Sequence, residues 1–289
     1  MTVAVWITDW LQLHAVEAAL KPRTIESYQD LVTRYVVPLI GGVAIENLSP
    51  LDVRHMLAVI IGQGKQRTAE LLYVMLKCAF AELDHNPMIH VKRPKHVPTS
   101  PEPWSDDEMA TYMAALPDHR HGVALSLAIA VGLRRGEICG LRWRDIDFVA
   151  GELHVVNQRV TLATGEIVDC SPKSKTSVRS IPLPAPLLGL LTARRGLPDV
   201  YVCSLTPSGL DQAHRALVRR LGLRPISLHG LRHSMATSCI RHGGQMRALQ
   251  GVLGHSSYAV TANIYTHVDH AILQSAVDAA TTACYTVLQ

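Results

Sequence analysis

Apolar positions recur at helical spacing through most of the first 85 residues. Four segments place apolar side chains three or four positions apart, which is the pattern of a helix with one buried face. Pro22 interrupts the pattern once, and the Gly41-Gly42 pair interrupts it again. The predicted helices cover residues 2–20, 24–40, 49–61 and 67–84. The pattern therefore predicts a small all-helical domain over residues 1–90.

Residues that cap helix ends stand at several of the expected boundaries. Thr24 is expected to cap the second helix, and Ser49, followed by proline, the third. Ser105 and Glu108 have the spacing of a capping box, in which each side chain bonds the other residue's backbone N–H. A second domain is therefore expected to begin with a helix at residue 105.

A proline-rich stretch separates the two helical patterns. Residues 86–104 contain five prolines and the basic residues Lys92, Arg93 and Lys95. Proline-rich chain resists packing and acts as a semi-rigid spacer. We interpret residues 91–103 as an interdomain linker. Its basic residues either contact phosphate groups or are ordinary solvated charges.

The pattern changes again in the second domain, residues 104–289. Residues 122–133 are almost wholly apolar and predict a buried helix. Residues 151–184 alternate β-branched and polar side chains, with turns expected at Thr164-Gly165 and around Ser174. The rest is mostly helical. We therefore expect a mostly α fold with a small β-sheet or hairpin in a mixed α/β second domain.

Composition narrows the class of protein only a little. Hydrophobic residues make up 48% of the chain and charged residues 18%, which is typical of a compact globular protein. No apolar run is long enough for a membrane span, and no export signal is visible. The six cysteines are scattered, which suits reduced thiols and a cytoplasmic location. A net charge of +4 permits an anionic partner without demonstrating one.

Two sequence clusters carry basic residues at special positions. The segment 132–143, GLRRGEICGLRW, places Arg134 directly after the apolar helix and Glu137 three residues later. Taken alone, this spacing fits an ordinary surface ion pair on a helix. The segment 172–183, PKSKTSVRSIPL, places Lys173 and Lys175 at the expected tip of a β-hairpin. Taken alone, this fits an ordinary exposed turn.

Two further clusters carry histidines and a tyrosine. If residues 227–237, SLHGLRHSMAT, are helical, His229, Arg232 and His233 share one face. A zinc site is disfavoured there because Gly230 stands where the zinc-protease motif needs glutamate. The segment 253–268, LGHSSYAVTANIYTHV, sets a histidine ten positions before Tyr265.

Together the four clusters supply two arginines, lysines, histidines and a tyrosine, without a pair of carboxylates suited to two metal ions. Guanidinium groups match phosphate oxygens, and histidines exchange protons near neutral pH. A phenol becomes a useful nucleophile when neighbouring groups hold its target and accept its proton. This inventory fits a metal-free transesterification of a phosphodiester by tyrosine.

The order of these clusters resembles the tyrosine recombinase family, also called phage-type integrases. GLRRGEICGLRW resembles its first arginine motif, HGLRH its His-x-x-Arg-His motif, and LGHSSYAVTANIYTHV the segment that ends in the nucleophile. The resemblance extends over nearly the whole chain. It implies a helical core-binding domain followed by a catalytic domain of tyrosine recombinase type.

The resemblance implies a role for each matching residue. Tyr265 would attack the scissile phosphate to form a 3′-phosphotyrosyl link, while Arg134 and Arg232 would hold the non-bridging oxygens. Glu137 and His233 would be structural supports.

Three further positions would handle protons and hydrogen bonds. His229 would be the general base, and His255 would hydrogen-bond the phosphate. Lys173 would be the general acid for the 5′-oxygen, with Lys175 as the alternative. The resemblance implies no metal, ATP or other cofactor.

The same resemblance implies double-stranded DNA as the partner, held in a C-shaped clamp between the two domains of the chain. It also implies a homotetramer that acts on two DNA sites. The location would be cytoplasmic and nucleoid-associated. Two other functions stay open at this point: a type IB topoisomerase-like DNA relaxer and a catalytically silent DNA-binding regulator. The sequence leaves open the target site and the choice between integration, excision and dimer resolution.

Overall fold

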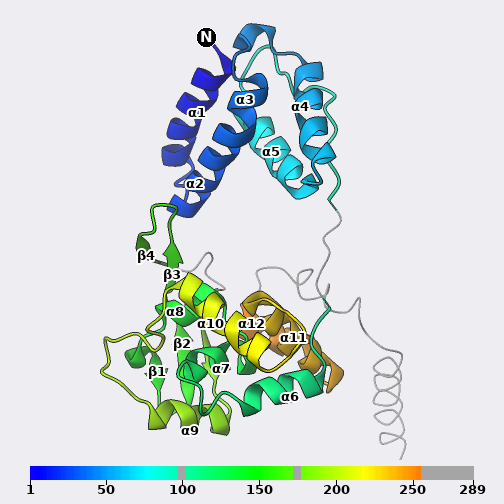
Figure 1. Cartoon of the computed structure of the whole chain (residues 1–289). Coiled ribbons are helices and arrows are strands. Elements are labelled where there is room, and N and C mark those ends of the chain that lie inside the picture. The colour runs from blue at the N-terminus through cyan, green and yellow to red at the C-terminus, as the bar shows by residue number, and fades with distance from the viewer. Residues whose placement is uncertain (97–101, 172–176, 255–289) are drawn as a thin grey trace, which may run out of the picture. The chain divides into compact units, whose positions relative to one another are not determined.

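The chain folds into two compact units, residues 1–100 and residues 101–289 (Figure 1). The structure is a computed structural model and describes residues 1–96, 102–171 and 177–254. No helix in these ranges is both long enough and apolar enough to span a bilayer.

The first unit is all-helical, as the sequence pattern predicts. Its elements are α1 (Val3–Glu17), α2 (Pro22–Leu31), the π-helical segment η1 (Val32–Val36), α3 (Val37–Ile40), the 3-10 turn η2 (Ile45–Asn47), α4 (Pro50–Gly62) and α5 (Gln66–Ala79). Their apolar faces form one core, in which Ile7, Val36, Ile60 and Leu72 are fully buried.

Prolines alter one predicted helix boundary and the geometry of one helix turn. The prediction that Thr24 caps the second helix is wrong, because α2 begins at Pro22, with Lys21 at the cap position. Proline suits the first helical position, where its missing N–H leaves no bond unmade. Pro38 lies farther along the same continuous helix, where it cannot donate a bond to the preceding turn. The turn before it is widened, and the Val37 N–H bonds the Val32 carbonyl five residues back.

The second unit surrounds a buried apolar core with helices and short strands. Its helical elements are α6 (Asp106–Ala114), α7 (Gly122–Ala130), α8 (Arg135–Gly140), the 3-10 turn η3 (Trp143–Asp145), α9 (Ala185–Ala193), α10 (Pro207–Arg220), α11 (Leu228–Arg241) and α12 (Met246–Leu253). Both predicted serine caps are confirmed: Ser49 in α4 and Ser105 in α6 each belong to a complete capping box. Helix α7 is apolar on all sides and runs through the core against α8, α9 and α11.

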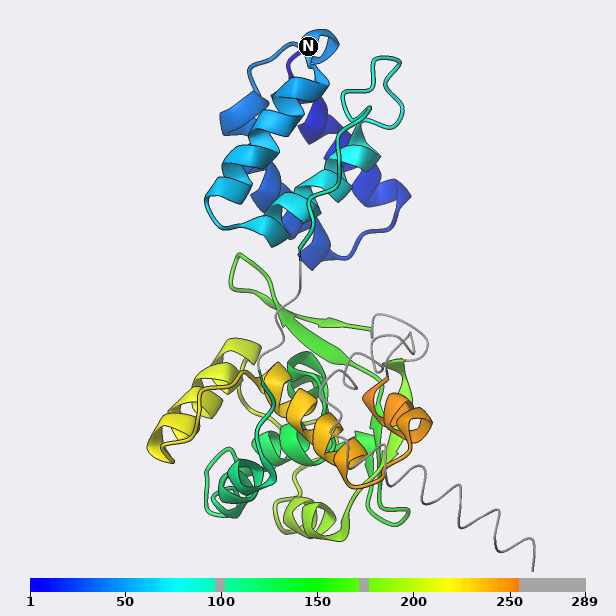
Figure 2. The same cartoon turned by 90° about the vertical axis from the view of Figure 1, so that its right-hand side faces the viewer.

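The strands form two small antiparallel sheets. They are β1 (Ile146–Asp147), β2 (Glu152–Val155), β3 (Gln158–Thr161), β4 (Ile167–Cys170) and β5 (Arg179–Pro182). One sheet has the order β1-β2-β5, and β3 pairs with β4 as a separate ribbon that extends from the second unit (Figure 2). The predicted turn at Thr164-Gly165 closes this ribbon, and Gly165 adopts a φ of +86° there.

The sequence prediction of a hairpin with lysines at its tip needs correction. The strands on either side of residues 172–176 are β4 and β5, and among the described strands β4 pairs with β3 whereas β5 pairs with β2. This segment therefore joins two sheets rather than the two arms of one hairpin. Lys173 and Lys175 themselves lie outside the described residues.

Candidate active site

Arg134 is placed by a tight turn at the end of the buried helix α7. Gly132 adopts a φ of +64°, and a Cβ built on it would lie 2.4 Å from Met235 Cε and 3.4 Å from Arg232 Cγ. The left-handed backbone favours glycine here, and a Cβ would also require the end of the Met235 side chain to move. The chain then turns into α8, for which Arg134 is the N-cap residue. The turn at Gly132 thus lies against α11, and Arg134 follows two residues later.

Glu137 links Arg134 to an arginine from a distant strand. The Arg134 backbone N–H and side-chain Nη1 each donate to Glu137 at 2.8 Å. Arg179 on β5 donates to both carboxylate oxygens, from Nη1 at 3.1 Å and from Nη2 at 3.0 Å. The side chains of Glu137 and Arg179 are only 3% and 7% exposed. The predicted Arg134–Glu137 pair therefore exists, but it is buried and shared rather than an isolated surface contact.

Three arginines donate to three successive carbonyl groups at the end of α12. Arg179 Nε donates to the Val252 oxygen at 2.6 Å, and Arg232 Nη2 donates to the Leu253 oxygen at 2.5 Å. Arg134 Nη2 donates to the Gly254 oxygen at 2.9 Å. The last carbonyls of a helix have no partner within the helix and carry partial negative charge, so cations are stabilised there.

These contacts gather more positive than negative charge at one place. We call Arg134, Arg179, Arg232 and Glu137 the arginine cluster. Its three guanidinium groups and one carboxylate leave a net charge of +2. Arg232 is only 2% exposed, and it also donates to the Gly132 oxygen at 2.5 Å. A buried excess of positive charge beside a partly exposed Arg134 is suited to binding an anion such as a phosphodiester.

The pKa values of the cluster reflect this imbalance. Burial and then the charge of Arg134 lower the pKa of Arg232 to about 9, so its charged form is destabilised although it still predominates at neutral pH. Burial by itself would raise the pKa of Glu137, but hydrogen bonds and charge from Arg179, and then Arg134, hold it below the usual range. Glu137 is therefore an ionised carboxylate that cannot act as a proton donor at neutral pH.

His229 lies beside the cluster in the first turn of α11. The residue reaches solvent, while neighbouring protein atoms partly enclose its imidazole. Partial burial of its imidazole and the charges of Arg232 and Arg134 lower its pKa from the ordinary value of 6.5. The imidazole is therefore neutral at neutral pH, which is the form that accepts a proton.

A network of hydrogen bonds, most of them buried, fixes the first half of α11 and the segment before it. Ser227 caps the helix by accepting from the Gly230 N–H at 3.0 Å. The Trp104 N–H donates to Ser234 Oγ at 2.8 Å. The rings of Tyr112 and His214 are bonded through the Tyr112 hydroxyl and His214 Nδ1 at 2.9 Å, and His214 Nε2 bonds the Ile226 carbonyl at 2.8 Å.

Helix α11 therefore presents His229 and Arg232 from a rigid base. The helical spacing predicted that these two residues share a face, and α11 is helical over that stretch. His233 follows on the same helix and is half-buried.

The structure brings together three of the six predicted catalytic residues. Arg134 and Arg232 both donate hydrogen bonds to carbonyl groups at the end of α12, and the charges of both lower the pKa of His229. The other three, Lys173, His255 and Tyr265, lie outside the described residues. The neighbouring Arg135 is not part of the cluster, since it points to Asp211 on α10.

Sequence reasoning missed Arg179, the third member of the cluster. It stands alone in the segment SVRSIP, and its partners Glu137 and Val252 are 42 and 73 residues away. A signal was nevertheless available, because an arginine two positions before the buried Ile181 alternates onto the same face of the strand.

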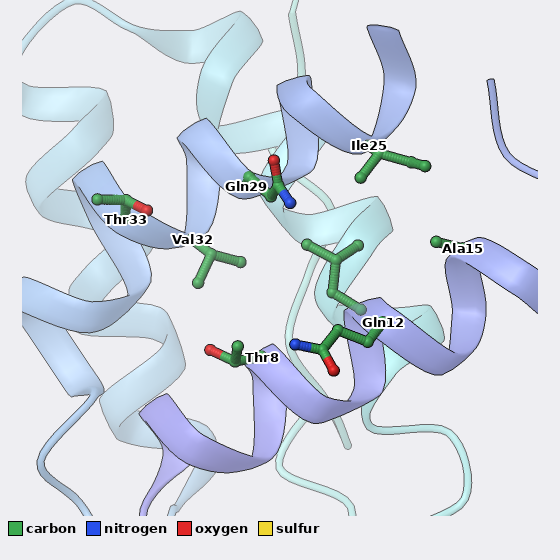
Figure 3. A pocket seen from close by; sticks show the side chains of 8 residues that line it. Thr8, Gln12, Ala15, Ile25, Gln29, Val32 and Thr33 are labelled. Atoms are coloured by element: carbon green, nitrogen blue, oxygen red, sulfur yellow. The ribbon is translucent and has the colours of Figure 1, made fainter. Parts of the chain in front are cut away.

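The first unit contains a pocket of its own. It lies between α1 and the α2–η1 helix, where Thr8 and Gln12 face Gln29 and Thr33 (Figure 3). It contains none of the predicted catalytic residues. In the part of the chain that the structure describes, no three His, Cys, Asp or Glu side chains are grouped as metal ligands.

Comparison with known proteins identifies the family. Residues 105–271 match the model of the phage integrase family, which is more than half of the chain. The chain belongs to this family. Among its curated relatives, a tyrosine recombinase XerC-like protein of Caldanaerobacter subterraneus is 29% identical over 90% of this chain and 77% of that protein. The integrase of ICEBs1 from Bacillus subtilis is 29% identical over 64% of this chain and 56% of that protein.

Solved structures show the same fold. The integrase of the Tn1549 transposon, bound to a circular intermediate DNA, has a TM-score of 0.80 at 18% identity and covers 96% of this chain and 99% of that one. A lambda integrase tetramer bound to a Holliday junction has a TM-score of 0.68 at 19% identity, over 91% of this chain and 77% of that one. This phage integrase family member is a tyrosine-type site-specific DNA recombinase, and the predicted fold class is confirmed.

Proposed function

We propose that the chain breaks and rejoins DNA by attack of Tyr265 on a phosphodiester held by Arg134 and Arg232. The phenol oxygen forms a bond to phosphorus, and the bond from phosphorus to the 5′-oxygen breaks. The products are a 3′-phosphotyrosyl link and a free 5′-hydroxyl. The observation that supports this step is the arginine cluster, whose buried net charge of +2 suits a phosphate that gains charge in its transition state.

Proton transfers complete the step. Neutral His229 accepts the phenol proton, because its pKa is lowered by burial and by the neighbouring guanidinium groups. Lys173, or Lys175 in its place, protonates the departing 5′-oxygen, and His255 hydrogen-bonds the phosphate. A 5′-hydroxyl from another strand then reverses the same chemistry, so the phosphodiester is restored in a new strand. Because the covalent link conserves the bond energy, the reaction needs no ATP.

The assembly is also part of the proposal. Double-stranded DNA is the partner, and four copies of the chain act on two sites. The lambda integrase tetramer on a Holliday junction supports this by analogy of fold. The helical first unit and the second unit would clamp the duplex, mainly through its phosphates. The cytoplasmic, nucleoid-associated location and the origin in a mobile element belong to the same proposal.

The proposal is tested on DNA that the protein itself selects. Bound duplexes are first enriched from a randomised library, and a nick is then placed beside each candidate cleavage point so that the short 5′ product escapes. We expect a protein–DNA adduct that survives SDS in the presence of a chelator and disappears in Tyr265→Phe. Specific binding without any adduct would instead favour a silent DNA-binding regulator.

A second assay separates recombination from topoisomerase activity. Plasmids carrying two selected sites should recombine, and plasmids without a site should keep their supercoils. Relaxation of a plasmid that lacks the site would favour the topoisomerase-like alternative.

A further inference from the structure

The geometry points to Arg179 as a positioning residue that keeps Arg134 available for the phosphate. Arg179 neutralises Glu137, which would otherwise be the full counter-ion of Arg134, and it holds the end of α12 in place. This inference rests on the proposed function. It assigns a role in that reaction to a residue outside the predicted catalytic set.

Two arginines share one carboxylate, and they share it unequally. Arg179 binds both oxygens of Glu137, whereas the side chain of Arg134 binds only one of them. A bidentate guanidinium–carboxylate pair is the stronger arrangement. The Arg179 side chain is 7% exposed and the Arg134 side chain is 34% exposed. The buried Arg179 is therefore the main partner of Glu137, and the more accessible Arg134 can also bind a ligand.

Arg179 also sets the charge of the cluster. Without it, the cluster would hold Arg134, Arg232 and the ionised Glu137, with a net charge of +1 in place of +2. The attraction between charges is strong where water is excluded, so this loss would weaken stabilisation of a phosphate that gains negative charge. Removal of the Glu137 charge as well would return the net charge to +2.

The end of α12 depends on Arg179 too. Arg179 Nε donates to the Val252 oxygen at 2.6 Å, while Nη1 also donates to the Ser177 oxygen at 3.0 Å. The next carbonyls in the chain, those of Leu253 and Gly254, bind Arg232 and Arg134. Arg179 therefore fixes the helix end against which both phosphate-binding arginines are oriented. Residue 255, a predicted phosphate ligand, follows directly in the sequence.

Three variants, one of them charge-compensated, test the inference. The three variants are Arg179→Met, Arg179→Lys and the double variant Glu137→Gln/Arg179→Met. Arg144→Met is the matched control, since Arg144 pairs with Asp199 at 2.5 Å in an exposed ion pair outside the cluster. Each protein is compared for affinity to the intact selected duplex and, at saturating protein, for the rate of adduct formation on the nicked duplex.

We expect Arg179→Met to slow adduct formation by roughly tenfold or more, with a smaller change in duplex affinity. The double variant should recover much of the lost rate, because it restores the net charge without restoring any bond of Arg179. Arg179→Lys should fall between the wild type and Arg179→Met, and the Arg144→Met control should match the wild type. A residue that served only to hold the fold together would not be rescued by removal of its partner's charge.

Each contrary result has a clear meaning. Equal rates for Arg179→Met and the wild type would overturn the inference, and so would a folded double variant that is as slow as Arg179→Met. If Arg179→Met does not fold, the test passes to the double variant and Arg179→Lys, and an inactive but DNA-binding double variant overturns the inference. If the wild type binds DNA and forms no adduct, the proposed function fails, and this inference fails with it.

Discussion

Replacement of Gly254 by alanine probes the junction between α12 and the arginine cluster. Gly254 adopts φ +62° and ψ +48°, the left-handed conformation that follows many helices. A Cβ built on it would lie 3.0 Å from Arg179 Nη1, 3.1 Å from its Cδ and 3.2 Å from its Cζ. Alanine there meets both backbone strain and a buried guanidinium that is held by other bonds.

The two effects can be given magnitudes and separated. Left-handed backbone costs alanine roughly 1–2 kcal/mol. Displacement of a well-packed side chain adds roughly 1–3 kcal/mol. Gly222 provides the matched control, because its φ is +66° and no atom lies within 4 Å of the position that a Cβ would occupy. Gly222→Ala therefore meets the backbone effect alone.

Urea unfolding and the adduct assay measure the two consequences. We expect Gly254→Ala to lose clearly more unfolding free energy than Gly222→Ala. It should also slow adduct formation by about tenfold or more, since it moves Arg179 and the carbonyl that orients Arg134. Gly222→Ala should keep the wild-type rate. Equal stability losses together with equal rates in the two variants would show that the Cβ of residue 254 does not disturb Arg179.

Three other outcomes are expected. His229 accepts a proton only when neutral, and its pKa lies below 6.5. The adduct rate should therefore rise with pH below neutrality and level off near pH 7, and His229→Ala should abolish that rise; an unchanged profile in the variant would exclude this base. Arg232→Lys should slow adduct formation about 100-fold, since one ammonium cannot bond both carbonyls and the phosphate, and a wild-type rate would remove Arg232 from the mechanism. Tyr112→Phe should lower the unfolding free energy by roughly 1–3 kcal/mol, because buried His214 Nδ1 loses its partner; an unchanged melting temperature would contradict this.

The helices and their local caps were predictable because their causes lie close together in the sequence. Ser105 and Glu108 are three residues apart, so a capping box can be recognised without tertiary information. The same holds for the shared face of His229 and Arg232 in α11. The boundary at Thr24 was misjudged because two local preferences competed, and the proline preference for the first helical position decided the outcome.

Strand pairing and the third arginine were beyond the same reasoning because their causes are distant in sequence. Whether β5 pairs with β4 or with β2 depends on the register of the whole sheet, so consecutive strands were wrongly expected to form one hairpin. Arg179 is held by hydrogen bonds to the Glu137 carboxylate on α8 and to the Val252 carbonyl at the end of α12. Main-chain carbonyls leave no signature in the sequence. The carbonyl groups at the end of α12 that bind the three arginines therefore became visible only in the structure.

The covalent bond between Tyr265 and DNA is the step on which the proposed mechanism depends, and peptide mapping of the trapped adduct would locate that bond. The adduct on the nicked duplex would be digested with nuclease and protease, and the peptide that carries a nucleotide would be identified by mass spectrometry. We expect a nucleotide joined through its 3′-phosphate to Tyr265. A nucleotide on Tyr258, on any other residue, or joined through a 5′-phosphate would contradict the mechanism.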